Sequence, residues 1–270
     1  MSLETPDVVF QELTEPGLLR DSMALRFSNY RETKGLCLME SLDTASGLDV
    51  DEFDVRSRHF GLVANARGER RLIGSLRVTQ PAATDYAEAV RAAVALAPTA
   101  VVRLEPRFHA ALPSLHYSAA RDGIAALVDQ ASVCGEPVLE AGRLVFARQC
   151  RENGLSATRR LAAFLVVGSA ALLDRTARVS NVLANCHAHH EAFYGPVGFR
   201  RLANRSFSTE PALGLSHVVL HRRPEWASVS CRATCAELAD AVERFGHARF
   251  DDFIPAAARA RGPISQEVAA

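Results

Sequence analysis

The spacing of apolar residues predicts a helix and then a β-hairpin near the N-terminus. Leu19, Met23 and Phe27 recur at i, i+4 and i+8, which places them on one face of a helix over about 15–33. Two runs rich in Val, Leu and Ile, HFGLVAN and RRLIGSLRVTQP, then lie on either side of Gly68. Two such runs joined by a short glycine-containing turn are typical of a hairpin.

The middle of the chain predicts helical segments, one strand and one long apolar helix. Residues 83–134 are rich in alanine and interrupted by prolines, with helical patterns near 86–96 and 119–133. The run PVLEAGRLVFARQ then predicts a strand, CRENGLSAT a polar loop, and the apolar stretch from about Thr158 a long helix. A strand, a polar loop and a helix N-terminus in this order are typical of an anion-binding site.

The last third of the chain continues the alternation of strands and helices. VSNVLANCH predicts a strand, HHEAFYGPVGF a short helix and turn, and LSHVVLHRR a final strand. We therefore expect an α/β fold, in the form of an α+β sandwich, over 1–222. Residues 223–270 are expected to form an appendage, with an amphipathic helix near 235–245 and a C-terminal tail.

Composition and charge narrow the class of protein. A chain of 270 residues with 48% hydrophobic content can bury a large core. Its 31 basic and 31 acidic residues balance, so no overall field attracts nucleic acid or an anionic membrane, and neither partner is expected. The apolar run 161–173 is too short to span a bilayer, and the N-terminus lacks a signal-peptide pattern, so we expect a cytoplasmic protein.

Cysteine and histidine positions give no sign of a disulfide framework or a metal site. The six cysteines show no repeated paired spacing, which indicates reduced thiols. The cluster CHAHHE holds His187, His189 and His190, but it lacks a second ligand pair at a recognised spacing. We expect no bound metal.

One charged pair lies inside an otherwise apolar strand. Burying the Glu140 carboxylate without a partner is costly, so it must face water or find a partner. Arg143, three residues later, points to the opposite face of a regular strand. A bulge at Gly142 would reset the alternation and bring both side chains to one cleft.

Several short motifs together resemble a known group of enzymes. In order, they are Arg26, Phe27 and Tyr30 in RFSNY; Asp51, Phe53 and Asp54 in DEFD; Gly74 and Arg77 in IGSLRV; Glu140 and Arg143 in LEAGRLVF; and 193–199, FYGPVGF. Over about 18–222 the chain is similar to the acyl-homoserine-lactone synthase and N-acyl amino acid synthase branch of the GNAT acyltransferases. It also resembles acyltransferases associated with bacterial exosortase systems.

Three departures from the homoserine-lactone synthases change what the resemblance implies about the acceptor. Those enzymes keep a tryptophan shortly after the first arginine, whereas the only tryptophan here is Trp226. Ala141 and Gly142 stand where serine or threonine is usual. His59 after Ser57 is closer to the exosortase-associated and N-acyl amino acid branches. S-adenosylmethionine is therefore a less favoured acceptor than an amino acid.

The resemblance implies a GNAT-like central twisted mixed sheet flanked by helices, and it implies site residues. The implied catalytic residues are Glu140 as base, Tyr194 as proton donor to the leaving thiolate, and Arg143. The implied substrate-binding network is Arg26, Asp51, Asp54 and Arg77. The implied positions for pantetheine and phosphate are Arg148, Arg151, Gly154 and Thr158. Asp49, Glu52 and the arginines that flank DEFD are interpreted as ordinary loop residues.

The implied reaction is acyl transfer from a thioester to the amine of an amino acid or related small amine. The donor is acyl carrier protein or coenzyme A, no tightly bound cofactor is expected, and the pattern does not specify the oligomeric state. RQCRENGLSA lacks the usual GNAT phosphate loop, which is compatible with a carrier-protein donor. The alternatives are an acyl-homoserine-lactone synthase that uses S-adenosylmethionine and a non-catalytic GNAT-like module that binds carrier protein.

Overall fold

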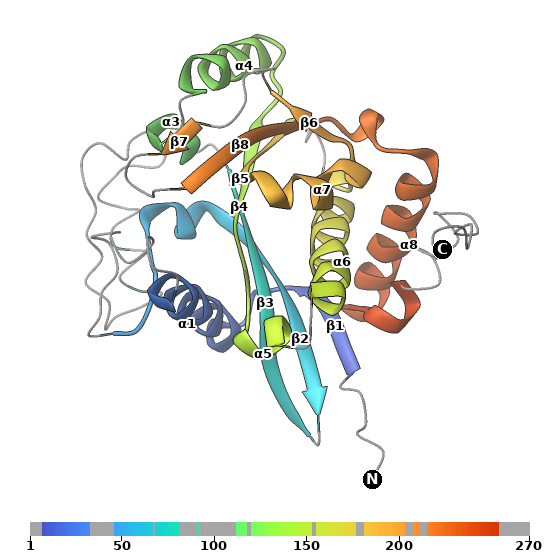
Figure 1. The fold of residues 1–270 in the computed structure, drawn as a ribbon. Coiled ribbons are helices and arrows are strands. Elements are labelled where there is room, and N and C mark those ends of the chain that lie inside the picture. Colours follow the sequence, from blue (N-terminus) through green and yellow to red (C-terminus); the bar gives the residue numbers. More distant parts are fainter. Residues whose placement is uncertain are drawn as a thin grey trace, which may run out of the picture.

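A mixed β-sheet forms the centre of the molecule (Figure 1). The computed structural model describes residues 7–32, 46–66, 68–80, 91, 95, 112–117, 120–152, 155–176, 181–202, 208–210 and 215–253. The strands are β1 (Asp7–Glu12), β2 (Ser57–Ala66), β3 (Glu69–Thr79), β4 (Val138–Phe146), β5 (Asn181–His187), β6 (Phe199–Arg201), β7 (Ser208–Glu210), β8 (Leu215–Arg222) and β9 (Ala248–Arg249).

The strand order is β6-β8-β5-β4-β3-β2-β1-β9, and β7 pairs with β8. β4 and β5 are parallel, whereas the other pairs in the described part of the sheet are antiparallel. The expected hairpin is confirmed as β2 and β3, and Gly68 between them has φ +83, a conformation that suits glycine. The expected mixed sheet is therefore confirmed.

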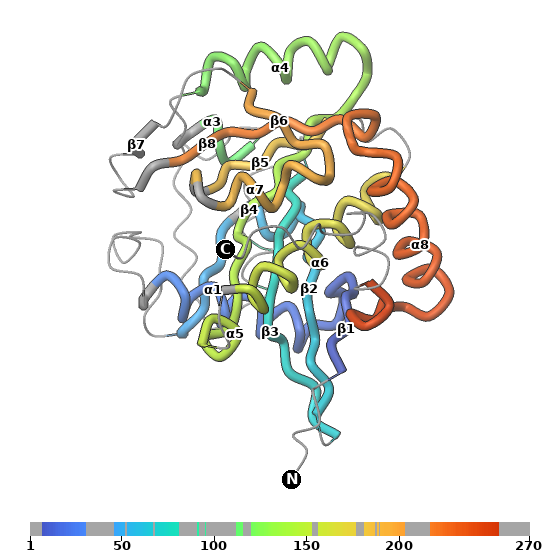
Figure 2. The backbone as a smooth tube through the Cα atoms, turned by 45° about the vertical axis from the view of Figure 1, so that its right-hand side comes forward, coloured from blue at the N-terminus to red at the C-terminus, as the bar shows by residue number. Residues whose placement is uncertain are grey.

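Helices cover both faces of the sheet (Figures 1 and 2). They are α1 (Pro16–Glu32), α3 (Ser114–Tyr117), α4 (Arg121–Val133), α5 (Arg148–Glu152), α6 (Leu155–Asp174), α7 (Glu191–Tyr194) and α8 (Val229–Phe245). The 3₁₀ segments in the described part of the chain are η1 (Glu52–Arg56), η3 (Ala188–His190), η4 (Gly195–Val197) and η5 (Pro224–Trp226). The helices expected near 15–33 and 119–133 are thus present as α1 and α4, while most of 86–96 lies outside the described residues.

The largest apolar core lies between the sheet and α6. Phe164 of α6 contacts Phe10 of β1 edge to face, with 6.0 Å between ring centroids, and Phe60 of β2 stacks on Phe10 at the same separation. Gly168 lies against the Phe10 ring, where a Cβ would meet ring carbons at 2.8 Å. This glycine therefore lets α6 approach the sheet closely.

α6 is a buried core helix. Its segment Ser156–Asp174 is long and apolar enough, by length and composition, to cross a membrane, and 61% of it is buried inside the protein. Figures 1 and 2 show α8 running beside α6 on the side away from the sheet. The apolar surface of α6 is accounted for by this packing on both sides.

The opposite face of the sheet is covered by α1 and α4. Leu18 of α1 packs in a cluster with Val63 and Leu72 of the hairpin. Ile124 of α4 packs in another cluster with Val138 of β4. The polar site described below lies on this face, next to α1.

Residues 224–253 are part of the sheet domain and not an appendage. The expected helix is present as α8, begins at the Ser228 cap, and contributes Cys235 and Leu238 to the same core as α6. Beyond it, β9 pairs with β1, and Phe253 lies 5.0 Å from Phe164 between ring centroids. The expected boundary at 222/223 is thus corrected: residues 224–253 share the core of the sheet domain, because α6 needs cover on its outer face.

Candidate active site

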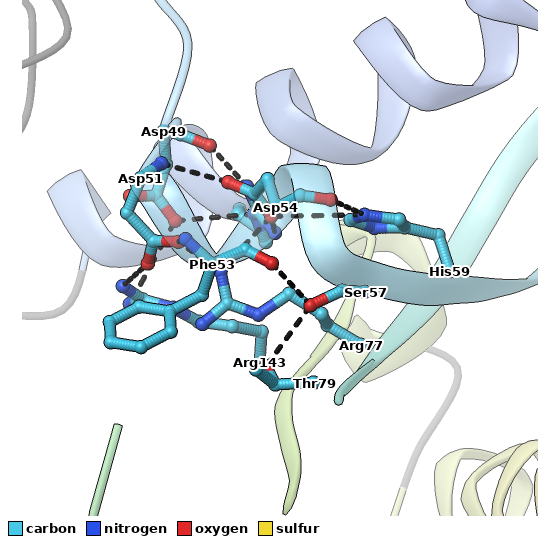
Figure 3. A network of polar contacts seen from close by, with 10 residues as sticks. Asp49, Asp51, Phe53, Asp54, Ser57, His59, Arg77, Thr79 and Arg143 are labelled. Atoms are coloured by element: carbon cyan, nitrogen blue, oxygen red, sulfur yellow. Dashed lines mark hydrogen bonds and ion pairs between the residues drawn. The ribbon is translucent and has the colours of Figure 1, made fainter. Parts of the chain in front are cut away.

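The motif DEFD folds into η1 and offers two carboxylates to the sheet. Asp51 caps this segment by accepting a hydrogen bond from the Phe53 N–H at 3.0 Å, and Asp54 accepts one from the Asp51 N–H at 2.8 Å. This reciprocal capping box fixes the backbone of both residues. The carboxylate oxygens of Asp51 and Asp54 also point towards arginine side chains, as Figure 3 shows.

Arg26 on α1 forms the most buried pair of this network. Its Nη1 and Nη2 donate to the two carboxylate oxygens of Asp54 at 2.7 and 2.9 Å. Its Nε lies 3.2 Å from Asp49 Oδ2, and its Nη2 also donates to the Asp49 carbonyl. Asp49 was interpreted from the sequence as a loop residue, but only 1% of its side chain is exposed, so that interpretation is wrong.

Arg77 and Arg143 complete the network from the sheet. Arg77 Nη1 donates to Asp51 Oδ1 and, at 3.0 Å, to Asp54 Oδ1. Arg143 Nη2 donates to Asp51 Oδ2 at 3.1 Å, and its guanidinium lies 5.1 Å from the centre of the Tyr30 ring. The structure therefore brings together Arg26, Asp51, Asp54, Arg77 and Arg143, as the motif order implied.

The charges in this network hold one another ionised. Burial raises the pKa of the Asp54 carboxyl, but Arg26 and Arg77 outweigh it and hold that pKa well below its usual range. Burial likewise opposes ionisation of Asp51, and Arg77 brings its pKa below the ordinary value. Removing one member would leave a buried charge without its partner, which is strongly destabilising.

His59 supports the same loop from β2. Its Nε2 lies 3.0 Å from the Asp54 carbonyl oxygen, so the ring donates from Nε2. Burial lowers the pKa of His59 in spite of the nearby Asp54 carboxylate. The side chain is 5% exposed and serves as a neutral hydrogen-bond donor to η1.

The expected bulge in β4 is confirmed, and Arg143 is its irregular residue. Ser75 of β3 pairs with Val145, but Arg77 pairs with Gly142, so β4 contains one extra residue between them. Arg143 has φ +57, in the left-handed region that residues other than glycine rarely occupy. The bulge turns the Arg143 side chain to the face of the sheet that Arg77 and Glu140 share.

Glu140 is buried beside this network and has a partner that the sequence did not indicate. Its Oε2 accepts a hydrogen bond from the Ser114 N–H at 2.9 Å, and its Oε1 accepts one from the Ser114 hydroxyl at 2.7 Å. Burial raises the pKa of Glu140, while the Ser114 donors, Arg77 and Arg143 limit that rise. A raised pKa makes the carboxylate a better base than an exposed glutamate.

The sheet opens after Ala141, the residue that follows Glu140. β4 and β5 pair over four positions, from Val138 with Asn181 to Ala141 with Ala184. Beyond Ala141, the described pairs of β4 are with β3. Beyond Ala184, the described pairs of β5 are with β8. The parallel strands therefore separate at the bulge. An opening between two strands offers backbone N–H groups to a ligand.

A second polar pair borders this opening from β5. Asn185 is the first residue of β5 beyond the paired segment, and its Oδ1 lies 3.2 Å from Nδ1 of His217 on β8. By strand alternation, Asn185 shares the face of Leu183, which pairs with Glu140. Sequence reasoning missed Asn185 because nothing in VSNVLANCH distinguishes it from a residue facing solvent.

Tyr194 lies apart from the acidic network. Its side chain is 2% exposed and lines a small apolar cavity with Ala141, Leu173 and Phe199, on the α6 face of the sheet. Glu140 precedes Ala141, so its side chain points to the other face. Burial raises the pKa of the Tyr194 phenol, which stays protonated at neutral pH. The structure does not bring Tyr194 next to Glu140, and its role as proton donor stays a prediction.

The residues expected to bind phosphate lie around the junction of α5 and α6. Arg148 is exposed and donates to Glu152 at 2.8 Å, and Arg151 is also exposed. The Thr158 hydroxyl donates to the Cys150 carbonyl at 2.7 Å, so it ties the two helices together. Gly154 lies outside the described residues.

Metal-binding side chains do not gather in the described part of the chain. No group of three or more His, Cys, Asp or Glu residues there could hold an ion. The side chains of His187 and His189 lie outside the described residues, so the histidine cluster is not tested. The expectation of no metal stays a prediction.

Comparison with known proteins supports the fold. No protein-family model matches the sequence, and no curated protein matches it either. The similarity to solved structures concerns the fold. FeeM, an N-acyl amino acid synthase from uncultured soil microbes, is similar with a TM-score of 0.50 and 13% identity, over 83% of this chain and 94% of FeeM.

Two synthases of acyl-homoserine lactones are also similar in structure. LasI matches with a TM-score of 0.43 and 12% identity, over 80% of this chain and 89% of LasI. BjaI, a coenzyme A-dependent acyl-homoserine lactone synthase, matches with a TM-score of 0.46 and 14% identity, over 93% of this chain and 99% of BjaI. At these identities the likeness concerns the fold.

Proposed function

We propose that this protein is an N-acyltransferase that transfers an acyl group from a thioester to the amine of an amino acid or related small amine. The observation that carries the proposal is the position of Glu140. It is a buried carboxylate with a raised pKa, and it lies one residue before the point where β4 and β5 separate. The similarity of the fold to an N-acyl amino acid synthase agrees with this proposal.

Glu140 is the base in the proposed reaction. An amino acid's amine is mostly protonated at neutral pH, so it must lose a proton before it can attack. Glu140 takes that proton directly or through one water molecule. A carboxylate has about four lone-pair positions, and Ser114 uses two of them. Among the described residues, two positions are thus left for the acceptor.

The opening of the sheet suits the thioester. Attack by the amine forms the C–N bond and a tetrahedral oxyanion, which backbone N–H groups at an irregular strand can stabilise. The bulge at Arg143 provides such an irregular strand. The C–S bond then breaks, and the nitrogen loses its extra proton to water to give the amide. The thiolate takes a proton, for which Tyr194 remains the proposed donor.

The aspartate and arginine network positions the acceptor side of the site. Arg26 and Asp54 are almost completely buried and act as a scaffold, whereas Arg143 and Asp51 keep 16% and 20% of their side-chain surface exposed. We propose that Arg143 presents its guanidinium to the acceptor's carboxylate, because a planar fork suits that group. Asp51 holds Arg143 in place through its Oδ2 and is itself held by Arg77 through its Oδ1.

The acyl donor is proposed to be acyl carrier protein or acyl-coenzyme A. Arg148 and Arg151 lie on α5, directly after β4, and both are exposed. Exposed arginines next to the opening can pair with the phosphate of a pantetheine arm. The pantetheine arm is common to both donors, so this contact does not separate them.

Product formation tests the proposal. The purified protein is incubated with acyl carrier protein and coenzyme A thioesters and a panel of amino acids, and the amide product is measured by mass spectrometry. We expect an amide product from the wild-type protein, and a loss of about 10²-fold or more in kcat for Glu140→Gln. The matched control is Glu243→Gln, which removes an exposed glutamate on α8.

Three other results would point away from the proposal. Formation of a lactone and methylthioadenosine from S-adenosylmethionine would identify a homoserine-lactone synthase. Tight binding of carrier protein without turnover would indicate a non-catalytic module. Full turnover by Glu140→Gln would remove Glu140 as the base.

A further inference from the structure

Ser114 contacts Glu140 from a part of the chain that carries none of the sequence motifs. It is the first residue of α3 and lies 26 residues before Glu140. Its side chain is 1% exposed, and it donates twice to one carboxylate, from its backbone N–H and from its hydroxyl. Two donors from one residue fix both oxygens of Glu140 and so fix the plane of the carboxylate.

Both contacts favour the ionised form of Glu140. The backbone N–H of Ser114 can only donate, so it needs an acceptor oxygen opposite it. A protonated carboxyl group would place its own O–H on one of the two oxygens, which would lose or weaken one of the contacts. Hydrogen bonds to the charged form of a carboxyl group lower its pKa, and Ser114 is the foremost influence acting against burial at Glu140.

The arginines near Glu140 do not take the place of Ser114 as hydrogen-bond donors to its carboxylate. Arg77 of β3 and Arg143 of β4 are the cations that act on the Glu140 carboxylate. Both guanidinium groups donate to Asp51, and Ser114 supplies the hydrogen bonds to Glu140 among the described residues. From β5, the residue paired with Glu140 is the apolar Leu183.

We propose that Ser114 is a positioning residue that holds the Glu140 carboxylate in the orientation and charge state needed to accept a proton from the acceptor amine. The inference rests on the proposed role of Glu140 as base. Ser114 does not touch the acceptor in this proposal, because both its donors are already engaged by Glu140. It acts on the reaction through Glu140 alone.

Titration of Glu140 tests the contact without any substrate. The full-length protein is labelled with carboxyl-¹³C glutamate, the Glu140 signal is assigned with Glu140→Gln, and its midpoint is followed by NMR against pH. Ser114→Ala removes the hydroxyl donor and keeps the backbone N–H. We expect its Glu140 midpoint to rise by about one pH unit, because a hydrogen bond to a charged group is lost.

Two further variants serve as controls for this titration. Ser114→Thr keeps the hydroxyl and should keep the wild-type midpoint. Thr234→Val removes a buried hydroxyl that donates to the Ser230 carbonyl at 3.1 Å on α8, and it should leave the midpoint unchanged. An unchanged midpoint in a folded Ser114→Ala protein would overturn the proposal.

A kinetic measurement follows with a donor and acceptor pair that the wild-type protein converts. The acidic limb of kcat against pH should move upward in Ser114→Ala by the same amount as the NMR midpoint. Ser114→Thr should restore the wild-type limb. A uniform loss of kcat at every pH, with the limb unmoved, would show that Ser114 has a structural role alone. If no pair reacts, the proposed function fails, while the titration still decides whether Ser114 controls Glu140.

Discussion

Arg26 and Asp54 lie 28 residues apart in the chain and meet through two parallel hydrogen bonds of 2.7 and 2.9 Å. Their side chains are 1% and 0% exposed. The pair joins α1 to η1 and thereby fixes the loop that carries Asp51 over the sheet. Buried pairs of this kind are costly to disrupt, which leads to the first prediction.

Arg26→Gln should lower the free energy of unfolding by about 3–5 kcal/mol, because it removes a buried cation from Asp49 and Asp54 and leaves their negative charges only partly balanced. The matched control is Arg175→Gln, since Arg175 pairs with Asp240 at a site where the two side chains are 44% and 66% exposed. That change should cost less than about 1 kcal/mol. Urea unfolding curves measure both, and equal costs would contradict the assignment of Arg26 as a buried scaffold.

The low pKa of Asp54 predicts how stability depends on pH. A carboxyl group whose folded pKa is depressed contributes stability above its unfolded pKa of about 3.9, and that stability is lost as the pH falls towards the folded pKa. The unfolding temperature of the wild-type protein should therefore drop steeply below about pH 5. Asp54→Asn should be less stable at pH 7 and should lose less on acidification, as thermal unfolding from pH 7 to pH 3 will show. A constant gap between the two proteins across this range would argue against a depressed pKa.

The left-handed backbone of Arg143 predicts an unusual order of substitutions. Arg143→Gly and Arg143→Val both lose the guanidinium, but valine is strained at φ +57 and glycine is not. The glycine variant should be more stable than the valine variant by about 1 kcal/mol. At Arg201, in the regular strand β6, the order should reverse because valine favours a strand. Denaturant unfolding of the four variants measures this, and the same order at both sites would refute the bulge.

The close approach of α6 to the sheet predicts a cost for one added methyl group. Gly168→Ala places a Cβ 2.8 Å from carbons of the Phe10 ring and should destabilise the protein by about 1–3 kcal/mol. Gly123→Ala on α4 meets only a Leu202 carbon at 3.9 Å and should stabilise by about 0.5–1 kcal/mol, through helix propensity. Unfolding temperatures compare the two helices, and a neutral Gly168→Ala would show that α6 can move away from Phe10.

Local pattern was sufficient for much of the fold. The helical spacing of Leu19, Met23 and Phe27 and the glycine between two apolar runs predicted α1 and the β2–β3 hairpin, because these elements depend on neighbouring residues. The same reasoning failed for residues 224–253, where an amphipathic helix alone did not reveal that its apolar face covers α6. A helical pattern predicts which face of a helix is buried, but it does not predict which element packs against that face.

The candidate site divides in the same way. The order of the motifs predicted that Asp51, Asp54, Arg77 and Glu140 belong to the site. Gly142 predicted a bulge in the strand that carries Glu140. The sequence could not show that Arg143 takes the left-handed conformation, because that follows from the register of β4 against β3. Nor could it place Tyr194, whose face of the sheet depends on how α7 packs against α6.

Local sequence patterns predicted the mixed α/β character, and the motifs identified the acidic and basic residues available for catalysis and their order. Only the tertiary structure decided that Asp49 is buried with Arg26 and that Ser114 holds Glu140. The physical reason is that hydrogen bonds and ion pairs between distant segments leave no periodic trace along the chain. Their partners become neighbours only when α1, η1 and α3 pack on one face of the sheet.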